Sequence, residues 1–199
     1  MIMTPLLQQL VQSLRCMPGI GPKSAQRIAF HLLRHRDDAR ILADSLHEAM
    51  DKIAYCASCR TFSETDLCVF CASDRRDKSI MCIVESPADQ YAIEQTAYRG
   101  MYFVLHGRLS PLDGIGPDEI GMTHLRERLS AELELREIII ATNPTLEGEA
   151  TAYYIAQLAK QSQIACTRIA HGVPLGGELE SIDTGTLTHA FAGRGIIAG

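Results

Sequence analysis

Cys56-Ala57-Ser58-Cys59 and Cys68-Val69-Phe70-Cys71 are two C-x2-C pairs separated by eight residues. Each pair can form a tight knuckle that presents two thiolates to one ion, and two knuckles complete the tetrahedral four-sulfur shell that Zn2+ prefers. Two disulfides and four buried thiols are the alternatives. Because four protein ligands leave no open position, we expect one structural zinc ion per chain and no catalytic role for it.

The charges divide unevenly on the two sides of these cysteines. The chain of 199 residues has a hydrophobic content of 46% and a net charge of −5, which suits one ordinary domain or two small ones. Residues 15–40 contain six basic and two acidic residues, whereas residues 80–199 contain eight basic and fifteen acidic ones. The basic amino-terminal part is therefore the candidate for contact with a polyanion.

The three other cysteines are Cys16, Cys82 and Cys166. An odd number of cysteines fits a reducing compartment, and the first residues lack the charged start and apolar run of a secretory signal. No stretch approaches the roughly 18 apolar residues of a membrane span. We therefore expect a cytoplasmic protein with no membrane association. Cys82 and Cys166 lie in apolar runs, where we expect inert core residues.

The amino-terminal part reads as helix, tight turn, helix. Leucines at helical spacing predict a helix over residues 4–15, and residues 17–22, Met-Pro-Gly-Ile-Gly-Pro, break it. Ser24 is the expected N-cap of the second helix. A third helix, whose apolar face runs from Leu42 to Ile53, leads directly into the first cysteine pair.

This turn has the features of a phosphate-binding hairpin. Gly19 and Gly21 have no side chains, so backbone N–H groups can approach an anion at a helix N-terminus. Lys23 and Arg27 follow one turn apart on the same helix face. Nothing here reads base edges, so we expect sequence-independent, salt-sensitive DNA binding. The alternative is an ordinary turn between packed helices.

From residue 79 onward, short apolar runs alternate with helical patterns, which predicts an α/β fold with a mainly parallel sheet covered on both faces. The expected strands are residues 80–84, 102–105, 138–141 and 164–169, and the expected helices are 87–98, 122–134, 148–160 and 185–193. The basic pair Arg75 and Arg76, just before this part, is balanced by neighbouring aspartates and is expected to be solvated surface.

The predicted strands end in a set of polar residues: Glu85 after the first strand, then Asn143, Glu147 and Glu149 after the third. Carboxylates clustered at strand ends can hold Mg2+ for phosphoryl transfer. The alternative is that Glu147 and Glu149 only favour the N-terminus of the following helix. For His106, after the second strand, a site residue is one interpretation, and a loop histidine with its hydrogen bonds satisfied is the one we expect.

Taken together, these parts resemble the bacterial recombination mediator family RecR. Residues 17–31 resemble its helix-hairpin-helix, the four-cysteine module follows in the same order, and residues 83–87 and 138–150 resemble its Toprim domain, the fold shared by topoisomerases and primases. Residues 107–117 and 172–177 also resemble the family. The resemblance implies a helix-hairpin-helix region at 1–53, a C4 zinc finger at 54–78, a Toprim domain at 79–174 and a carboxyl-terminal tail for oligomer contacts at 175–199.

The resemblance also implies a function. RecR proteins act in recombinational DNA repair without sequence-specific recognition, on single-stranded, duplex or gapped DNA. They form dimers and ring-like tetramers, and they act with RecO and RecF to help load RecA onto single strands. The Toprim surface serves partner and oligomer contacts, so Glu85, Asn143, Glu147 and Glu149 are candidate partner-surface residues. The family is not regarded as enzymatic, and its site of action is the nucleoid.

One departure bears on catalysis. Catalytic Toprim enzymes have a glutamate after the first strand and D-x-D after the third, and this chain has Glu85 but Asn143-Pro144-Thr145. We therefore do not expect a two-metal site, although a single Mg2+ ion stays open. The alternatives to a DNA-binding mediator are a Mg2+-dependent nuclease or strand-transfer enzyme that uses Glu85, Glu147 and Glu149, and an adaptor that binds only proteins.

Overall fold

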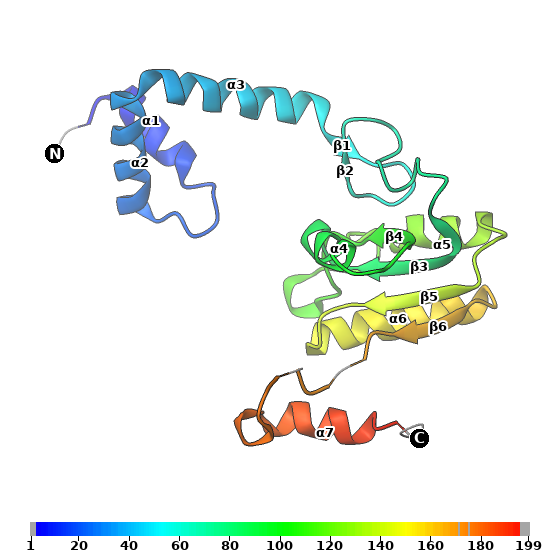
Figure 1. Ribbon diagram of the computed structural model, residues 1–199. Helices are drawn as coiled ribbons and strands as arrows, with labels where there is room; N and C mark the ends of the chain where they lie inside the picture. Colours follow the sequence, from blue (N-terminus) through cyan, green and yellow to red (C-terminus); the bar gives the residue numbers. More distant parts are fainter. Residues whose placement is uncertain (1–2, 171, 175, 196–199) are drawn as a thin grey trace. The chain divides into compact units, whose positions relative to one another are not determined.

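The computed structural model describes residues 3–170, 172–174 and 176–195 (Figure 1). The chain divides into two compact units, Met1–Ala54 and Tyr55–Gly199. Leu175, which belongs to the segment 172–177 that resembles the family, lies outside the described residues, as does His171. Within the described ranges, no helix combines the length and apolar character needed to cross a membrane.

The first unit consists of three helices, α1 (Pro5–Leu14), α2 (Pro22–Arg34) and α3 (Arg36–Lys52). Ala25 and Ala29 on α2 are completely buried, and their small side chains let α1 and α2 pack closely. α3 has no buried residue, so its apolar face is open to solvent in the single chain. The predicted order of helix, turn and helix is confirmed.

The second unit contains a sheet of four parallel strands, as the sequence predicted. The strands are β3 (Asp77–Val84), β4 (Gly100–Val104), β5 (Glu137–Ala141) and β6 (Ala165–Arg168), in the order β4-β3-β5-β6. The crossovers are α4 (Pro87–Glu94), α5 (Met122–Ala131) and α6 (Leu146–Gln161). We call residues 77–170 the α/β body.

The alternation of side chains along β3 separates two cores. Met81 and Ile83 face the cluster that α5 and α6 cover, whereas Cys82 and Val84 face a second cluster. The second cluster contains three of the four motif cysteines. A cysteine module, which we define as residues 55–76, therefore covers one face of the sheet together with α4.

Smaller elements complete the described chain. β1 (Ala54–Tyr55) pairs with β2 (Phe62–Ser63), and the short 3-10 helices are η1 (Pro111–Asp113) and η2 (Leu179–Ser181). The last helix, α7 (Thr184–Ala192), forms where the sequence predicted it, whereas α4 is shorter than predicted. α4 ends at Glu94 because the backbone N–H of Thr96 turns back to the carbonyl of Ile93, at 2.9 Å.

Two residue predictions are wrong. Cys166 is exposed, because β6 is an edge strand and this side chain is not covered by a helix; Cys82 is buried as expected. Arg76 is not solvated surface, since its side chain is only 9% exposed. Its local sequence is charged, but the fold brings Tyr102 and the Glu94 carboxylate of the α/β body next to it, beside Phe70 of the cysteine module.

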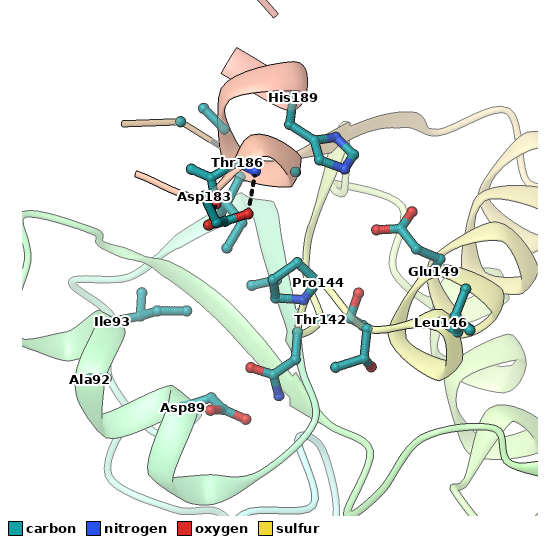
Figure 2. Close-up of a pocket in the computed structure, with 17 residues that line it drawn as sticks. Asp89, Ala92, Ile93, Thr142, Pro144, Leu146, Glu149, Asp183, Thr186 and His189 are labelled. Carbon is teal, nitrogen blue, oxygen red and sulfur yellow. Dashed lines mark hydrogen bonds between the residues drawn. The ribbon is translucent and has the colours of Figure 1, made fainter. Parts of the chain in front are cut away.

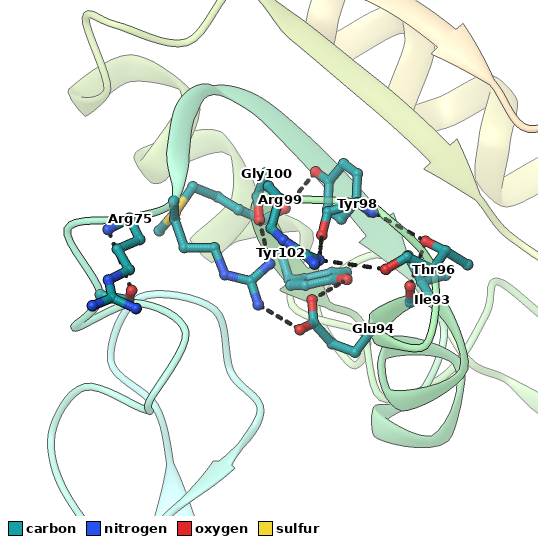
Figure 3. A network of polar contacts seen from close by, with 11 residues as sticks. Arg75, Ile93, Glu94, Thr96, Tyr98, Arg99, Gly100 and Tyr102 are labelled. Atoms are coloured by element: carbon teal, nitrogen blue, oxygen red, sulfur yellow. Dashed lines mark hydrogen bonds and ion pairs between the residues drawn. The ribbon is translucent and has the colours of Figure 1, made fainter.

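Arg76 ties the cysteine module to the α/β body. Figure 3 shows three residues of the α/β body that take part in this contact, Glu94, Gly100 and Tyr102. Its guanidinium donates to a carboxylate oxygen of Glu94 at 2.5 Å and to the carbonyl of Gly100 at 3.1 Å. The guanidinium carbon also lies 4.9 Å from the ring centre of Phe70 and 5.6 Å from that of Tyr102. The Tyr102 hydroxyl donates to the other Glu94 oxygen at 2.6 Å, so both carboxylate oxygens are bound.

We predict that Glu94→Gln destabilises the second unit by about 3 kcal/mol, because it leaves the Arg76 charge buried without its counter-ion. Burial raises the pKa of Glu94, but the hydrogen bonds from Arg76 and Tyr102 outweigh it, and the pKa lies below its ordinary value of 4.5. This stabilisation is therefore present above pH 4.5 and is lost as the pH falls through the lowered pKa.

Urea unfolding followed by tyrosine fluorescence between pH 3 and pH 7 measures this effect. The chain has no tryptophan, and all six tyrosines lie in the second unit. Glu127→Gln, which neutralises an exposed carboxylate on α5, is the control. Equal stability of both variants at pH 7 would contradict a structural role for the pair.

Candidate functional site

The turn before α2 is built by its proline and glycine. Ile20 donates its backbone N–H to the carbonyl of Met17 at 3.2 Å, and Gly19 has a φ of +77°. With Pro18 at the second position, this is a type II turn, which requires the positive φ that glycine adopts without strain. The turn places the start of α2 immediately after it.

The prediction that Ser24 caps α2 is wrong. The helix begins at Pro22, and its N-cap is Gly21, which has no side chain to accept a hydrogen bond. Proline at the first helical position has the right φ and no N–H to satisfy, so it starts the helix three residues earlier than predicted. The N-terminus of α2 therefore carries backbone N–H groups without a side-chain cap.

The space above this hairpin is open. A Cβ atom built on Gly19 or Gly21 would meet no atom within 4 Å. Lys23 and Arg27 are both exposed on α2, one turn apart. The four hairpin residues singled out in the sequence thus lie together within the first unit, where an anion can reach both backbone N–H groups and cationic side chains.

The four motif cysteines form one cluster. Their sulfur atoms all lie within 4.8 Å of one another, and three of the side chains are buried while Cys71 is half-buried. A zinc ion bonded at about 2.3 Å to four thiolates places the sulfurs about 3.8 Å apart in a tetrahedron. The cluster fits that geometry, and zinc there would act as a structural ion that has no open ligand position.

Thiols of this cluster are close enough to form hydrogen bonds with one another, and the bond between Cys59 and Cys68 changes the pKa of both. The Sγ atoms of Cys59 and Cys68 are 3.4 Å apart, and the backbone N–H of Cys68 donates to the sulfur of Cys56 at 3.3 Å. Hydrogen bonding to Cys68, together with burial, raises the pKa of Cys59, and the same hydrogen bond lowers the pKa of Cys68. A bound cation would stabilise the thiolate form of these cysteines.

The first knuckle is docked on the edge strand β4. The carbonyl of Cys59 accepts from the backbone N–H of Val104 at 2.8 Å, which continues the sheet by one hydrogen bond. The carbonyl of Ser58 accepts from Arg128 of α5 at 3.1 Å, and this guanidinium also donates to the carbonyl of Tyr102 at 2.6 Å. The knuckle therefore blocks an edge that would otherwise expose unpaired backbone groups.

Arg60 and His106 close the other side of this contact. Both have a positive φ, 64° and 59°, which non-glycine residues rarely adopt. His106 donates from Nε2 to the carbonyl of Arg60 at 2.5 Å, and Arg60 donates to the carbonyl of Ile120 at 2.9 Å. Gly121 has a φ of +75°, which favours glycine, and a Cβ atom there would displace the Arg60 guanidinium.

At the carboxyl ends of the strands, Glu85 is held by protein groups. Its two carboxylate oxygens accept from the backbone N–H and the side-chain amide of Asn143, at 2.8 and 2.7 Å, and Arg108 lies 3.8 Å away. The side chain of Glu85 is only 7% exposed. Asn143, which stands where the sequence analysis looked for an aspartate, therefore donates to both oxygens of Glu85.

The other two carboxylates do not join Glu85. Glu149 pairs with Arg168 at 2.6 Å, and Glu147 lies in the first turn of α6, where it favours the helix dipole. Figure 2 shows Glu149 and Asp89 on different sides of a cavity of about 800 Å3. Among the described residues, only the cysteine cluster brings three or more potential metal ligands together.

Comparison with known proteins now bears on the whole chain. Family models match the RecR helix-hairpin-helix at residues 7–50, the RecR four-cysteine zinc finger domain at 53–73, the Toprim domain at 79–170 and the RecR carboxyl-terminal region at 172–194. The recombination protein RecR of Xanthomonas oryzae pv. oryzae strain MAFF 311018 is 57% identical over 96% of this chain and 98% of its own length.

The chain belongs to the RecR family. The recombination protein RecR of Xanthomonas axonopodis pv. citri strain 306 is 56% identical over the same share of both chains. The similarity thus covers all four parts in the order that the sequence predicted. It confirms the resemblance and the Toprim-type fold.

Several residues that organise this RecR-family site were not predicted from the sequence. Arg128 lies on a helix of mixed charge, and Arg60 lies in a polar loop, so neither has a local pattern that marks it as buried. Arg108 stands in a segment that resembles the family, but its neighbours in the sequence indicate no role for it. The roles of these three arginines are visible only in the tertiary structure, where two of them donate to backbone carbonyls and the third lies beside a carboxylate.

We predict that purified protein contains about one zinc ion per chain and that Cys68→Ser abolishes zinc binding and lowers the melting temperature, because three ligands hold the ion far less tightly. Elemental analysis and thermal unfolding measure both quantities. Cys16→Ser, at an exposed cysteine outside the cluster, is the control. Metal-free protein with only three titratable thiols of seven would instead support the disulfide alternative.

Proposed function

We propose that this RecR-family chain is a non-enzymatic, non-sequence-specific DNA-binding mediator of recombinational DNA repair. The observation that carries the proposal is the open hairpin of Gly19 and Gly21 with its uncapped helix start and exposed cations. Backbone N–H groups and cationic side chains contact phosphates, which are identical in every sequence. Its binding is therefore independent of sequence.

Binding through a few phosphates is weak for a single chain, and assembly would strengthen it. We propose a homodimer or a ring-like homotetramer, in which several hairpins act on one DNA molecule. In support, α3 leaves Ile41 and Met50 exposed by 65% and 76%, which a second copy would cover. We also propose that the tail from residue 175 onward contributes to oligomer contacts.

The proposed partners follow from the family. We propose that this protein acts with RecO and RecF to promote loading of RecA onto single-stranded DNA, in the cytoplasm at the nucleoid. The proposed division of labour gives DNA binding to residues 1–53, zinc-dependent rigidity to 54–78 and partner contact to the Toprim domain at 79–174. The structural zinc ion has no direct role in DNA binding.

Two features of the Toprim edge support a non-enzymatic function. The Glu85 carboxylate accepts two hydrogen bonds from Asn143, and Glu149 is paired with Arg168. Neither arrangement presents the set of carboxylates that a two-metal nuclease needs. The alternative, a Mg2+-dependent nuclease or strand-transfer enzyme, would require Glu85 to leave Asn143 when the metal binds.

We predict that Lys23→Ala with Arg27→Ala weakens binding to a gapped duplex by at least tenfold at moderate salt. The slope of log affinity against log salt should fall by about 0.9 for each duplex phosphate that the variant no longer binds. Fluorescence anisotropy over a salt series measures both. Lys78→Ala with Lys160→Ala removes the same charge from exposed positions of the second unit and is the control.

The same DNA, incubated with Mg2+ and run on denaturing gels, separates the mediator from the enzyme. Intact strands are the result expected of a mediator. Shortened strands that disappear with Glu85→Gln would establish the enzyme alternative. Absence of DNA binding at every salt concentration, with or without RecO, would leave the protein-binding adaptor.

We propose that the acidic edge of the Toprim domain, which carries Glu147 and Glu149, binds a basic surface of a partner such as RecO. Glu147→Lys is the cleaner test, because Glu149→Lys would also repel Arg168. We predict slower association and a weaker salt dependence, as expected for a charge at the rim of an interface. Surface plasmon resonance measures the rates, with Glu134→Lys as the control. Unchanged kinetics would remove Glu147 from the partner surface.

A further inference from the structure

A second nucleic-acid feature lies beyond the hairpin, on α2 itself. A groove of about 370 Å3 follows one face of the helix. The residues that line it share helical spacing and include three cations, two polar or aromatic rings and one amide: Lys23, Gln26, Arg27, Phe30, His31 and Arg34. α2 carries no carboxylate, so the charge of this face is uniformly positive.

The groove is long enough for several phosphates. Lys23 and Arg34 are eleven residues apart, which corresponds to about 16 Å along a helix axis. The hairpin stands at one end of this distance, and Arg34 stands at the last turn of α2. A strand that enters at the hairpin can therefore continue along the helix face and meet a cation at each end and near the middle.

The exposed ring of Phe30 in this cationic groove has no electrostatic explanation. Its side chain is 39% exposed and lies among the cations of the groove, whereas the buried contacts of α2 are made by the alanines on its other face. The neighbouring His31 ring is held by His35, with ring centres 4.4 Å apart. An exposed ring in a basic groove is the combination with which single-strand-binding proteins stack unpaired bases.

We infer that the α2 groove is a track for unpaired DNA, in which Phe30 stacks on a base while Arg34 extends the phosphate contacts of Lys23 and Arg27. This inference rests on the proposed function and adds the class of substrate to it. A base in a duplex has both faces covered by its neighbours, so Phe30 can stack only where the strand is single or at a junction. The groove thus favours single-stranded DNA and the ends of gaps over intact duplex.

Phe30→Leu tests the inference, because leucine keeps an apolar side chain and a good helix former but has no ring. We expect binding to a single-stranded oligonucleotide to weaken about tenfold, binding to blunt duplex to change less than twofold, and the salt slope to stay constant. Phe30→Trp should restore single-strand binding. Leu33→Ala is the control, since Leu33 is similarly exposed on α2 but lines a different groove beside α1.

A second readout reports stacking directly. A single-stranded oligonucleotide with 2-aminopurine should lose fluorescence when it binds wild-type protein and the Phe30→Trp variant, and should keep it with Phe30→Leu. Arg34→Gln should lower the slope of log affinity against log salt for single strands by about 0.7, the value for one phosphate contact. The oligonucleotide should still lose its fluorescence when it binds this variant.

The outcomes distinguish this inference from the proposed function. If the Phe30→Leu variant binds single strands as tightly as the wild type does, the inference is overturned. In that case, loss of DNA binding in the Lys23 and Arg27 double variant still supports the mediator. The inference is also overturned if Phe30→Leu weakens binding to single-stranded and duplex DNA equally and changes the mass measured by size-exclusion chromatography with light scattering. Phe30 would then act through subunit assembly. Unchanged DNA binding in the double variant would overturn the proposed function itself.

Discussion

The second unit depends on the contact between the first cysteine knuckle and the edge of the sheet. The four cysteines hold the knuckle in one conformation, and its carbonyl groups then accept from Val104, Arg128 and His106. Each of these bonds is accepted by a backbone carbonyl of residues 58–60, so it depends on the backbone geometry of the knuckle. The Arg60 guanidinium adds one side-chain bond, to the carbonyl of Ile120. A cation that fixes the cysteines thereby also fixes one edge and one face of the sheet.

The same arrangement explains why a small module can occupy the place of a helix. Parallel sheets need cover on both faces, and here α5 and α6 cover one face while α4 shares the other with the cysteine cluster. The Arg76–Glu94 pair fixes the second end of the module. In this unit, the cysteine module is held in place by its contacts with the α/β body. In the first unit, the hairpin is held by two closely packed helices.

At the carboxyl ends of the Toprim strands, one carboxylate is held by neighbouring protein groups. Glu85 keeps its place after the first strand, but Asn143 binds both of its oxygens, and Arg108 lies beside it. The carboxylate now holds the β5–α6 loop in position, since the loop backbone at Asn143 is one of the groups it binds. The strand ends gather polar residues at one edge, which is a consequence of parallel topology.

The sequence by itself determined the helix-hairpin-helix, the four-cysteine cluster and the parallel α/β body, because spacing and periodicity are local properties of the chain. It also located Glu85 and Asn143 at neighbouring strand ends. Tertiary structure alone decided that Arg76 is buried, that Cys166 is exposed and that His106 and Arg60 join the module to the sheet. These outcomes depend on residues distant in the chain, since burial and hydrogen bonding are set by neighbours in space and no local pattern encodes them.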